Sequence, residues 1–267
     1  MNCSSSISMQ PAVYIVGAGP GDPELLTIRA EKLIAAADVI LFADSLVPEQ
    51  ILTNTRPDAE LIRTAHKTLE EIVPLMIERV RRGRSVVRLH SGDPSLYGAI
   101  YEQMQQLAEA GINLEIVPGI SAFQVAAARL QVELTVPELV QTIILTRISG
   151  RATAVPPKEE LASLAAHQAS LCLYLSARHI EAAQTALLEH YSPEIPVAIC
   201  YRLGWPDELI RVVPLTEMAT VTRQEKLERT TLYLISPALT PVPNSQPKRS
   251  GLYNPQHSHL FRPRAQV

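Results

Sequence analysis

Hydrophobic and polar positions follow one repeating pattern through the first half of the chain. Apolar runs at residues 12–16, 38–42, 61–64, 85–90 and 114–117 are typical of short buried strands. Between them lie stretches with apolar residues at helical spacing, at 24–36, 69–82, 95–110 and 122–130. Strands that alternate with helices of this length predict a largely parallel sheet covered by helices on both faces.

The second half is less uniform, but it also alternates. Strands are predicted at 142–147, 171–176, 197–202 and 231–236, with 209–213 as a fifth candidate, and helices at about 158–167, 178–190 and 215–226. The chain is therefore expected to be an α/β protein with a hinge near 133–141, where Pro137 interrupts a polar stretch. The predicted parts are a flexible N-terminus at 1–11, an N-terminal α/β domain at 12–134, a C-terminal α/β domain at 135–240, and a disordered Pro-rich basic tail at 241–267.

Charge is distributed unevenly along the chain. The 267 residues are 46% hydrophobic, enough for a sizeable core, and carry a formal net charge of −3. Residues 241–267 hold Lys248, Arg249, Arg262 and Arg264 and no carboxylate, so the first 240 residues carry −7. An acidic body disfavours nucleic acid as a partner, because polyanion binding needs a basic surface.

Cysteine usage and hydropathy indicate the compartment. Cys3, Cys172 and Cys200 show no CxxC spacing and cannot all pair, which favours a reducing environment and argues against a disulfide framework or a cysteine-built zinc site. No metal site is predicted. The N-terminus lacks the pattern of a secretory signal, and no apolar run approaches the ~18 residues of a membrane span. We expect a cytoplasmic protein with no membrane partner.

Three glycine-containing turns follow predicted strands, at 17–22, 91–94 and 118–122. The first resembles a dinucleotide-binding loop, but Asp22 stands where the third glycine belongs and Pro20 removes an amide donor. A negative side chain there opposes a phosphate. Each turn alone has a plain alternative, a tight turn or, at Asp93, a helix N-cap. Together, at strand ends where open α/β sheets bind ligands, they indicate a ligand with an adenosine part and no pyrophosphate.

These turns carry a family resemblance. The segments VGAGPGDPELLT at 16–27, SGDP at 91–94 and VPGISA at 117–122 resemble, in this order, the motifs of the tetrapyrrole (corrin and sirohaem) methyltransferases. The resemblance covers roughly residues 12–239. Further segments are similar to the precorrin-4 C11-methyltransferase subgroup: ADSLV at 43–47, RLHSGDPSLYGAI at 88–100, TVPE at 135–138, QTIILTR at 141–147, and YR with WPDE at 201–208.

The resemblance implies a two-domain tetrapyrrole-methylase fold. Each domain would be a mixed, mostly parallel sheet flanked by helices, with a ligand cleft between the two and a homodimer as the assembly. It implies S-adenosylmethionine (SAM) as methyl donor and S-adenosylhomocysteine as product, with SAM contacts at Pro20, Ser91, Gly92, Asp93, Leu96, Ser121, Ala122, Leu175 and Leu203. Two departures are the Leu203-Gly204 pair, where two small residues are expected, and a loose segment at 151–154.

The implied reaction is displacement at a sulfonium methyl by C11 of the macrocycle, which requires no metal and no covalent enzyme intermediate. Alignment of the reacting atoms can contribute about 7–11 kcal/mol. Asp44 is the candidate catalytic residue, as proton acceptor or substrate-orienting group, with a helix cap as the alternative role. The substrate is rich in carboxylates, and nine basic groups near strand ends or loops could offset them: Arg63, His66, Lys67, Arg88, His90, Arg147, Arg151, Arg178 and Arg202. The predicted substrate residues are Ser45, His90, Tyr97, Arg147, Arg151 and Arg202, with packing an equal alternative for Tyr97.

Other functions stay open at this point. The nearest is methylation of another ring carbon of a precorrin or of uroporphyrinogen. An RNA ribose methyltransferase is disfavoured by the acidic body and the scarcity of aromatic residues, which serve as stacking platforms for bases. A non-catalytic SAM-binding module would bind the donor without turnover. The sequence does not distinguish a metal-free from a cobalt-loaded substrate.

Overall fold

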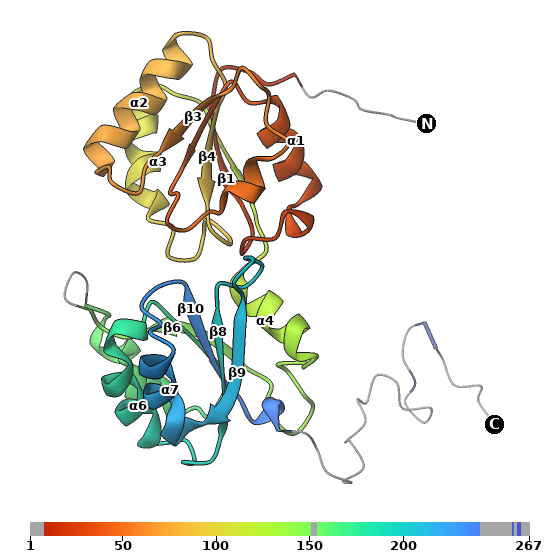
Figure 1. Ribbon diagram of the computed structural model, residues 1–267, viewed down its shortest axis with the longest axis vertical. Helices are drawn as coiled ribbons and strands as arrows, with labels where there is room; N and C mark the ends of the chain where they lie inside the picture. The colour runs from red at the N-terminus through yellow and green to blue at the C-terminus, as the bar shows by residue number, and fades with distance from the viewer. Residues whose placement is uncertain (1–7, 151–153, 241–257, 259–260, 263–267) are drawn as a thin grey trace. The chain divides into compact units, whose positions relative to one another are not determined.

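The computed structural model describes residues 8–150, 154–240, 258 and 261–262. Contacts divide the chain into two compact units, shown in Figure 1. The first contains the residues up to Ala126 together with Tyr201–Leu209, and the second contains Ala127–Cys200 and the residues from Ile210 onward. The division lies earlier than the predicted boundary at 134. Residues 1–7 and nearly all of the predicted tail lie outside the described residues.

The first unit is built on a five-stranded sheet of β1 (Val13–Gly17), β2 (Val39–Phe42), β3 (Glu60–Arg63), β4 (Val86–His90) and β5 (Leu114–Val117). Their order is β3-β2-β4-β1-β5, and every neighbouring pair is parallel. The prediction of a parallel sheet is therefore confirmed here. We call the end of the sheet where the strands finish its carboxyl edge and the opposite end its amino edge.

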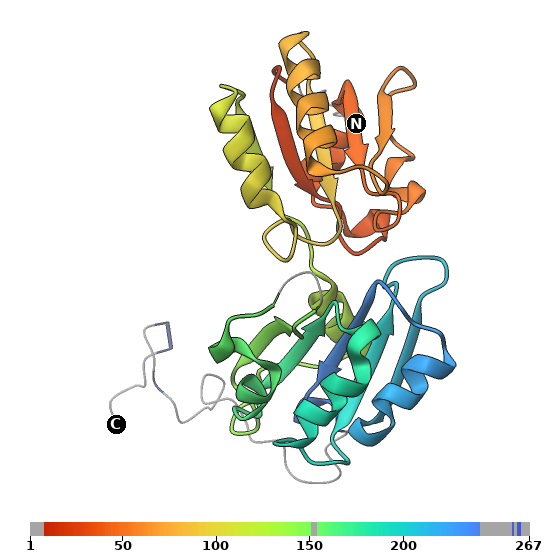
Figure 2. The ribbon, with the colours of Figure 1, turned by 90° about the vertical axis from the view of Figure 1, so that its left-hand side faces the viewer.

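Three helices cover the two faces of this sheet: α1 (Ile28–Ala36), α2 (Leu69–Arg81) and α3 (Ile100–Glu109), as Figure 1 shows, and Figure 2 looks onto the face that carries α2 and α3. Leu33 and Ile34 of α1 pack with Val87 and Leu89 of β4 on one face. On the other face Val86 of β4 packs with α2 and α3, in a core that includes Ile72, Met76 and Leu107. Since side chains alternate along a strand, Arg88 and His90 share the α2/α3 face with Val86.

Two helices begin later than the sequence predicts. The stretch expected as a helix at 24–36 opens with a 3₁₀ turn, because Asp22 accepts a hydrogen bond from Glu24 N at 2.9 Å. Thr27 then caps α1 by accepting from Ala30 N at 3.1 Å, so the helix starts at Ile28. The helix predicted at 95–110 starts only at Ile100. Asp22 and Pro23 favour a turn over helix in the first of these openings, and the left-handed backbone at Tyr97 and Ala99 delays the second helix.

The second unit contains β6 (Ile143–Arg147), β7 (Ser170–Tyr174), β8 (Pro196–Tyr201), β9 (Leu209–Pro214) and β10 (Thr231–Ile235) in the order β6-β7-β10-β8-β9. β6 and β7 are parallel, whereas β7 and β10 are antiparallel, so this sheet is mixed, as expected. Its helices are α5 (Leu161–Ala165), α6 (Ile180–Leu188) and α7 (Met218–Gln224), and α4 (Ala122–Leu130) runs across the division between the units. The fifth strand candidate, at 209–213, is confirmed as β9.

Short 3₁₀ turns complete the described elements: Pro23–Leu25, Glu49–Leu52, Pro157–Glu159, Ala177–His179, Leu215–Glu217 and Pro237–Leu239. Within the described ranges, no helix is long and apolar enough to cross a membrane.

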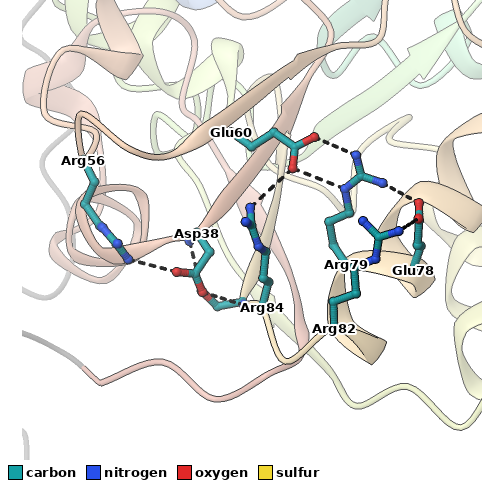
Figure 3. Close-up of polar contacts among 8 residues, drawn as sticks. Asp38, Arg56, Glu60, Glu78, Arg79, Arg82 and Arg84 are labelled. Atoms are coloured by element: carbon teal, nitrogen blue, oxygen red, sulfur yellow. Dashed lines mark hydrogen bonds and ion pairs between the residues drawn. The ribbon is translucent and has the colours of Figure 1, made fainter.

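Charged residues fasten the amino edge of the first sheet (Figure 3). Asp38, directly before β2, accepts hydrogen bonds from Ser85 N at 2.9 Å and Ser85 Oγ at 2.7 Å, and from Arg56 Nη1 at 2.9 Å. Glu60 of β3 accepts from Arg79 Nη2 of α2 at 2.7 Å. These contacts tie β2, β3 and β4 together and lie at the end of the sheet opposite the glycine turns.

Candidate active site

The three glycine turns meet backbone to backbone at the carboxyl edge of the first sheet. Gly19 N donates to Gly92 O at 3.2 Å, and Gly92 N donates to Gly19 O at 2.7 Å. A Cβ on Gly119 would lie 2.2 Å from Gly92 O and 2.8 Å from Gly17 Cα. A side chain has no room at Gly17 or Gly119, so glycine is required at these two positions for steric reasons. Turns separated by about a hundred residues in sequence thus form one surface.

Three of the backbone amides in these turns are already engaged within the chain. Gly19 N and Gly92 N bond to each other's carbonyl oxygens, and Ala18 N donates to His90 O at 2.7 Å. A phosphate-binding loop instead points its N–H groups at the ligand. These three amides are therefore not available to a phosphate.

Asp93 connects two of the turns. Its Oδ2 accepts from Gly119 N at 2.9 Å, and its Oδ1 accepts from Ser95 N at 2.8 Å and from the Ser95 hydroxyl. Partial burial raises the pKa of this carboxyl, but the hydrogen bonds from Ser95 and Gly119 outweigh it and hold the pKa below its usual value. The Asp93 carboxylate is thus ionised and shapes the turn. Its predicted contact with SAM stays a prediction.

The segment between Asp93 and α3 has an unusual backbone. Tyr97 and Ala99 have φ of 55° and 48°, in the left-handed region, and a Cβ on Gly98 would lie 2.3 Å from Pro94 O. Left-handed conformations in non-glycine residues cost on the order of 1–3 kcal/mol and cluster at functional sites. Tyr97 is 43% exposed. It is therefore not a core residue, which weakens the packing alternative for its role.

The third turn leads into α4. Ser121 is buried, and its N–H donates to Gln124 Oε1 at 2.9 Å, which caps the first turn of the helix. Ala122 is the first residue of α4. Ser91 and Leu96 flank Gly92 and Asp93, and Leu96 N donates to Asp93 O at 3.2 Å. The predicted SAM contacts from Ser91 to Ala122 therefore lie on the surface formed by the second and third turns.

Asp44 follows β2 at the same edge. Its Oδ1 accepts from Ala65 N at 3.3 Å, which links the end of β2 to the end of β3. No α-helix starts at this position, because residues 43–47 form a turn closed by hydrogen bonds from Leu46 N and Val47 N to Ala43 O. The helix-cap alternative for Asp44 is therefore wrong. Ser45, beside it, is exposed.

Arg88 and His90 lie at the end of β4, directly before the second turn. Arg88 is 7% exposed and His90 is 9% exposed. Burial lowers the pKa of Arg88 to about 10. Burial, with a smaller contribution from the Arg88 charge, lowers the pKa of His90 to about 3, so His90 is neutral at physiological pH.

The segment 201–209 returns from the second half of the sequence to pack on the first turn. Trp205 Nε1 donates to Pro20 O at 3.2 Å, and Gln50 Nε2 donates to Gly21 O at 2.7 Å and to Gly204 O at 2.8 Å. No sequence pattern indicates a role for Gln50, and Trp205 enters only through the WPDE similarity. The one feature of the sequence that could have drawn attention to Trp205 is that it is the chain's one tryptophan and directly follows Gly204.

Two predicted residues belong to this segment. Leu203 is buried, and its carbonyl oxygen lies 3.2 Å from the position of a Cβ on Gly21. Arg202, with φ of 46°, stacks over the Trp205 ring at 4.6 Å and pairs with Asp207 at 2.6 Å. Its guanidinium therefore already has partners within the chain.

The remaining predicted site residues lie in the second unit or outside the described residues. Leu175 directly follows β7, is 66% exposed and has φ of 53°. Arg147 ends β6 and donates from Nη1 to Ile148 O at 3.5 Å. Arg151 lies outside the described residues.

Within the described ranges, no group of three His, Cys, Asp or Glu side chains could hold a metal ion. Cys172 and Cys200 are both buried, and they are not joined in a disulfide bond. Burial raises the pKa of the Cys172 thiol to about 12, so Cys172 is a core residue and not a nucleophile.

Two named relatives are similar to this chain over nearly its whole length. A cobalt-precorrin-4 C(11)-methyltransferase of Methanocaldococcus jannaschii is 44% identical over 251 residues, covering 94% of this chain and 95% of the relative. A precorrin-4 C(11)-methyltransferase of Pseudomonas aeruginosa is 43% identical over 251 residues, covering 94% of this chain and 98% of the relative.

Two solved structures of methyltransferases are similar to this chain in fold. The X-ray structure of a cobalt precorrin-4 methyltransferase, described as a cobalamin biosynthetic enzyme, superposes with a TM-score of 0.83 at 41% identity, covering 86% of this chain and 97% of the other. A uroporphyrin-III C-methyltransferase from Thermus thermophilus, complexed with S-adenyl homocysteine, gives 0.71 at 28% identity, covering 85% and 98%. The family model for tetrapyrrole (corrin/porphyrin) methylases matches residues 12–219, and the chain belongs to that family.

Proposed function

We propose that this chain is a SAM-dependent methyltransferase that adds a methyl group to C11 of precorrin-4, or of its cobalt form, in cobalamin biosynthesis. The observation that carries the proposal is the junction of the three glycine turns at one sheet edge, formed by the segments that resemble the family's motifs. The similarity to enzymes named for C11 methylation supports this position over other ring carbons.

The residues at this edge fit SAM. Asp22 and the engaged amides of Gly19 and Gly92 disfavour a pyrophosphate, whereas the backbone of the glycine turns allows a close approach. The complex of the uroporphyrin-III methyltransferase with S-adenyl homocysteine supports the same class of ligand. We assign SAM contacts to Pro20, Ser91, Gly92, Asp93, Leu96, Ser121, Ala122, Leu175 and Leu203. SAM supplies an electrophilic methyl group and its own leaving group.

The protein's contribution is alignment. The turns are fixed to one another by hydrogen bonds and by the absence of side chains at Gly17 and Gly119, so a ligand meets a preformed surface. Holding two reactants in a productive geometry can contribute about 7–11 kcal/mol. A carboxylate near a sulfonium binds it in the ground state, but that attraction weakens as the charge disappears, so it is not the main source of rate.

Asp44 is the proposed catalytic residue. It lies at the carboxyl edge with one carboxylate oxygen held by Ala65 N. The other oxygen can accept a proton from the macrocycle or orient it. Ser45, His90, Tyr97, Arg147, Arg151 and Arg202 are proposed to contact substrate. For Arg202 this requires sharing its guanidinium with Asp207, since the two already pair.

The experiment that tests the proposal is product analysis. Purified protein is incubated with methyl-labelled SAM and with precorrin-4, in metal-free and cobalt-loaded preparations, and the label is located in the macrocycle. Label at C11 supports the proposal, and the faster preparation identifies the substrate form. Tight SAM binding without transfer would instead favour a non-catalytic module. The homodimer, proposed from the family resemblance, is tested by sedimentation equilibrium.

A further inference from the structure

Three buried side-chain atoms lack a hydrogen-bond partner among the residues that the structure describes. They are Arg88 Nε, His90 Nε2 and Gln103 Oε1. Buried polar groups are almost always paired, so each exception needs an explanation. Arg88 and His90 are two positions apart on β4 and share the α2/α3 face. Gln103 Oε1 is an acceptor, so it does not complement an anion and contributes nothing to a site for one.

Arg88 is a buried cation that has no carboxylate partner within the described part of the chain. The hydrogen bond that its side chain makes there goes from Nη1 to Thr64 Oγ1, a neutral acceptor, at 2.8 Å. In the register of the sheet its neighbours are Ile15 of β1 and Leu41 of β2, both apolar. Other arginines near the strand ends and loops have carboxylate partners: Arg63 pairs with Glu49, Arg178 with Glu228, and Arg202 with Asp207.

The unpaired charge of Arg88 destabilises the folded state, because the free-energy cost of removing the guanidinium from water is not offset by a neighbouring carboxylate. Loss of the charge by deprotonation does not relieve the cost, since the pKa of about 10 keeps Arg88 protonated at physiological pH. Natural proteins break such local rules at functional sites and compensate for the cost elsewhere. The missing partner is therefore expected to come from outside the chain.

The position of Arg88 indicates which partner this is. Arg88 lies four positions before Gly92, in the strand that leads into the second glycine turn. Its partner Thr64 directly follows β3. Asp44 is hydrogen-bonded to the next residue, Ala65, at the same end of β3. The Arg88 charge lowers the pKa of His90, which shows that the two side chains are electrostatically coupled. A neutral imidazole nitrogen can donate one hydrogen bond and a guanidinium several, so the pair presents donors without any anionic acceptor.

We propose that Arg88 and His90 form a buried binding subsite for one carboxylate of the macrocyclic substrate. Arg88 binds the carboxylate through Nε and a terminal nitrogen, the bidentate arrangement that guanidinium favours. His90 Nε2 donates to the same group, and Thr64 fixes the guanidinium plane. The identity of the ligand rests on the proposed function. The need for an external anion follows from the unpaired charge alone.

The test compares Arg88→Met with Arg88→Lys and with the control Arg84→Met. Arg84 is half exposed and pairs with Glu60 at the amino edge, so its replacement removes the same charge far from the proposed subsite. The probe is uroporphyrin III, a polycarboxylate macrocycle, titrated by absorbance without turnover. SAM affinity is measured by calorimetry, and unfolding is followed in urea.

We expect R88M to bind the probe at least tenfold more weakly, with SAM affinity within twofold of wild type and stability equal or higher. R88K keeps a point charge but not the bidentate geometry, and its affinity is expected to lie between the two. R84M should bind the probe like wild type. The proposal is overturned if R88M, or R88K in the event that R88M does not fold, binds uroporphyrin III as tightly as wild type. Failure of methyl transfer to C11 in the wild type would count against the proposed function alone, because probe binding needs no turnover.

Discussion

Trp205 Nε1 donates a hydrogen bond to Pro20 O at 3.2 Å, across 185 positions of the sequence. The contact brings the chain's one tryptophan onto the first glycine turn, where a Cβ on Gly21 would lie 2.5 Å from Trp205 Cδ1. Gln50 Nε2 donates to both Gly21 O and Gly204 O, which also holds the segment 201–209 against the first turn. The segment 201–209 is therefore a structural part of the first unit, although its neighbours in sequence belong to the second.

Gly21→Ala should destabilise the protein mainly through Trp205. The new methyl group meets the indole, and the φ of +150° adds backbone strain in any background. In a double-mutant cycle with Trp205→Ala, we expect G21A to cost about 1–3 kcal/mol less when the indole is absent, since neighbours in contact are not additive. Urea unfolding of the four proteins measures this. Equal costs in both backgrounds would show that the indole does not restrict Gly21.

Gly119→Ala should disrupt the junction of the turns. Its Cβ would meet two backbone atoms, Gly92 O and Gly17 Cα, neither of which can move like the end of a flexible side chain. We expect a loss of more than about 2 kcal/mol of stability and at least a tenfold loss of SAM affinity. The matched control is Gly111→Ala, at φ of +69° with nothing within 4 Å of its Cβ, which should cost only about 1–2 kcal/mol. Calorimetric SAM titration separates the variants, and equal SAM affinity in both would contradict this role of the junction.

Stability should fall with decreasing pH in two windows, which overlap only between about pH 3 and 4. His90 has a folded pKa lowered to about 3 from the ordinary 6.5, so between these values the unfolded chain binds a proton that the folded chain does not. Stability from His90 is therefore present above about pH 6.5 and is lost as the pH drops toward 3. His90→Gln should flatten this part of the profile by up to a few kcal/mol.

Asp38 affects the pH dependence of stability in the lower of the two pH windows. Burial raises the pKa of its carboxyl, but hydrogen bonds from Ser85 and Arg56 outweigh this and lower the pKa below its ordinary value of 3.8. Its stabilising effect is present above about pH 4 and is lost as the pH falls through the depressed value. Asp38→Asn should flatten the profile only there. Urea unfolding at a series of pH values distinguishes the two residues, and identical profiles for H90Q, D38N and wild type would refute both assignments.

Asp44→Asn should lower turnover much more than SAM affinity. Asparagine keeps an oxygen that can accept from Ala65 N, so the link between the ends of β2 and β3 is retained. The negative charge and the proton acceptor are lost, and the rate should fall about 10²–10⁴-fold if Asp44 takes a proton. Single-turnover kinetics with saturating SAM measure the effect. An unchanged rate would remove Asp44 from the mechanism.

Local pattern was sufficient to predict most of the first unit. The strands at 12–16, 38–42 and 85–90 are apolar because both faces of a parallel sheet are covered, and each ends in turn residues. The first residue of a helix was harder to predict than the presence of the helix. Residues 95–99 have no helix-breaking proline, and the left-handed Tyr97 and Ala99 delay α3 to Ile100. That conformation is accompanied by close packing of Gly98 against Pro94, which no helical periodicity reveals.

The site was predicted in part, for the same reason. The glycine turns could be identified because their chemistry is written in consecutive residues and they resemble known motifs. Arg88 was one of nine candidate basic groups, and nothing in the sequence indicates that it would face Ile15, Leu41 and a neutral threonine. The return of Trp205 to Pro20 is likewise a long-range contact that no local pattern encodes. Whether a charged side chain has a partner depends on residues that are distant in the sequence, so it is known only once the chain is folded.

The ring position of the transferred methyl group decides whether the proposed function is correct. The protein is incubated with SAM carrying a ¹³C-labelled methyl group and with precorrin-4, with and without cobalt, and the product is examined by NMR. One new labelled methyl group, at C11, is expected in at least one of the two preparations. Label at C17, C2 or another ring carbon, or no transfer by a protein that binds both ligands, would contradict C11 methylation.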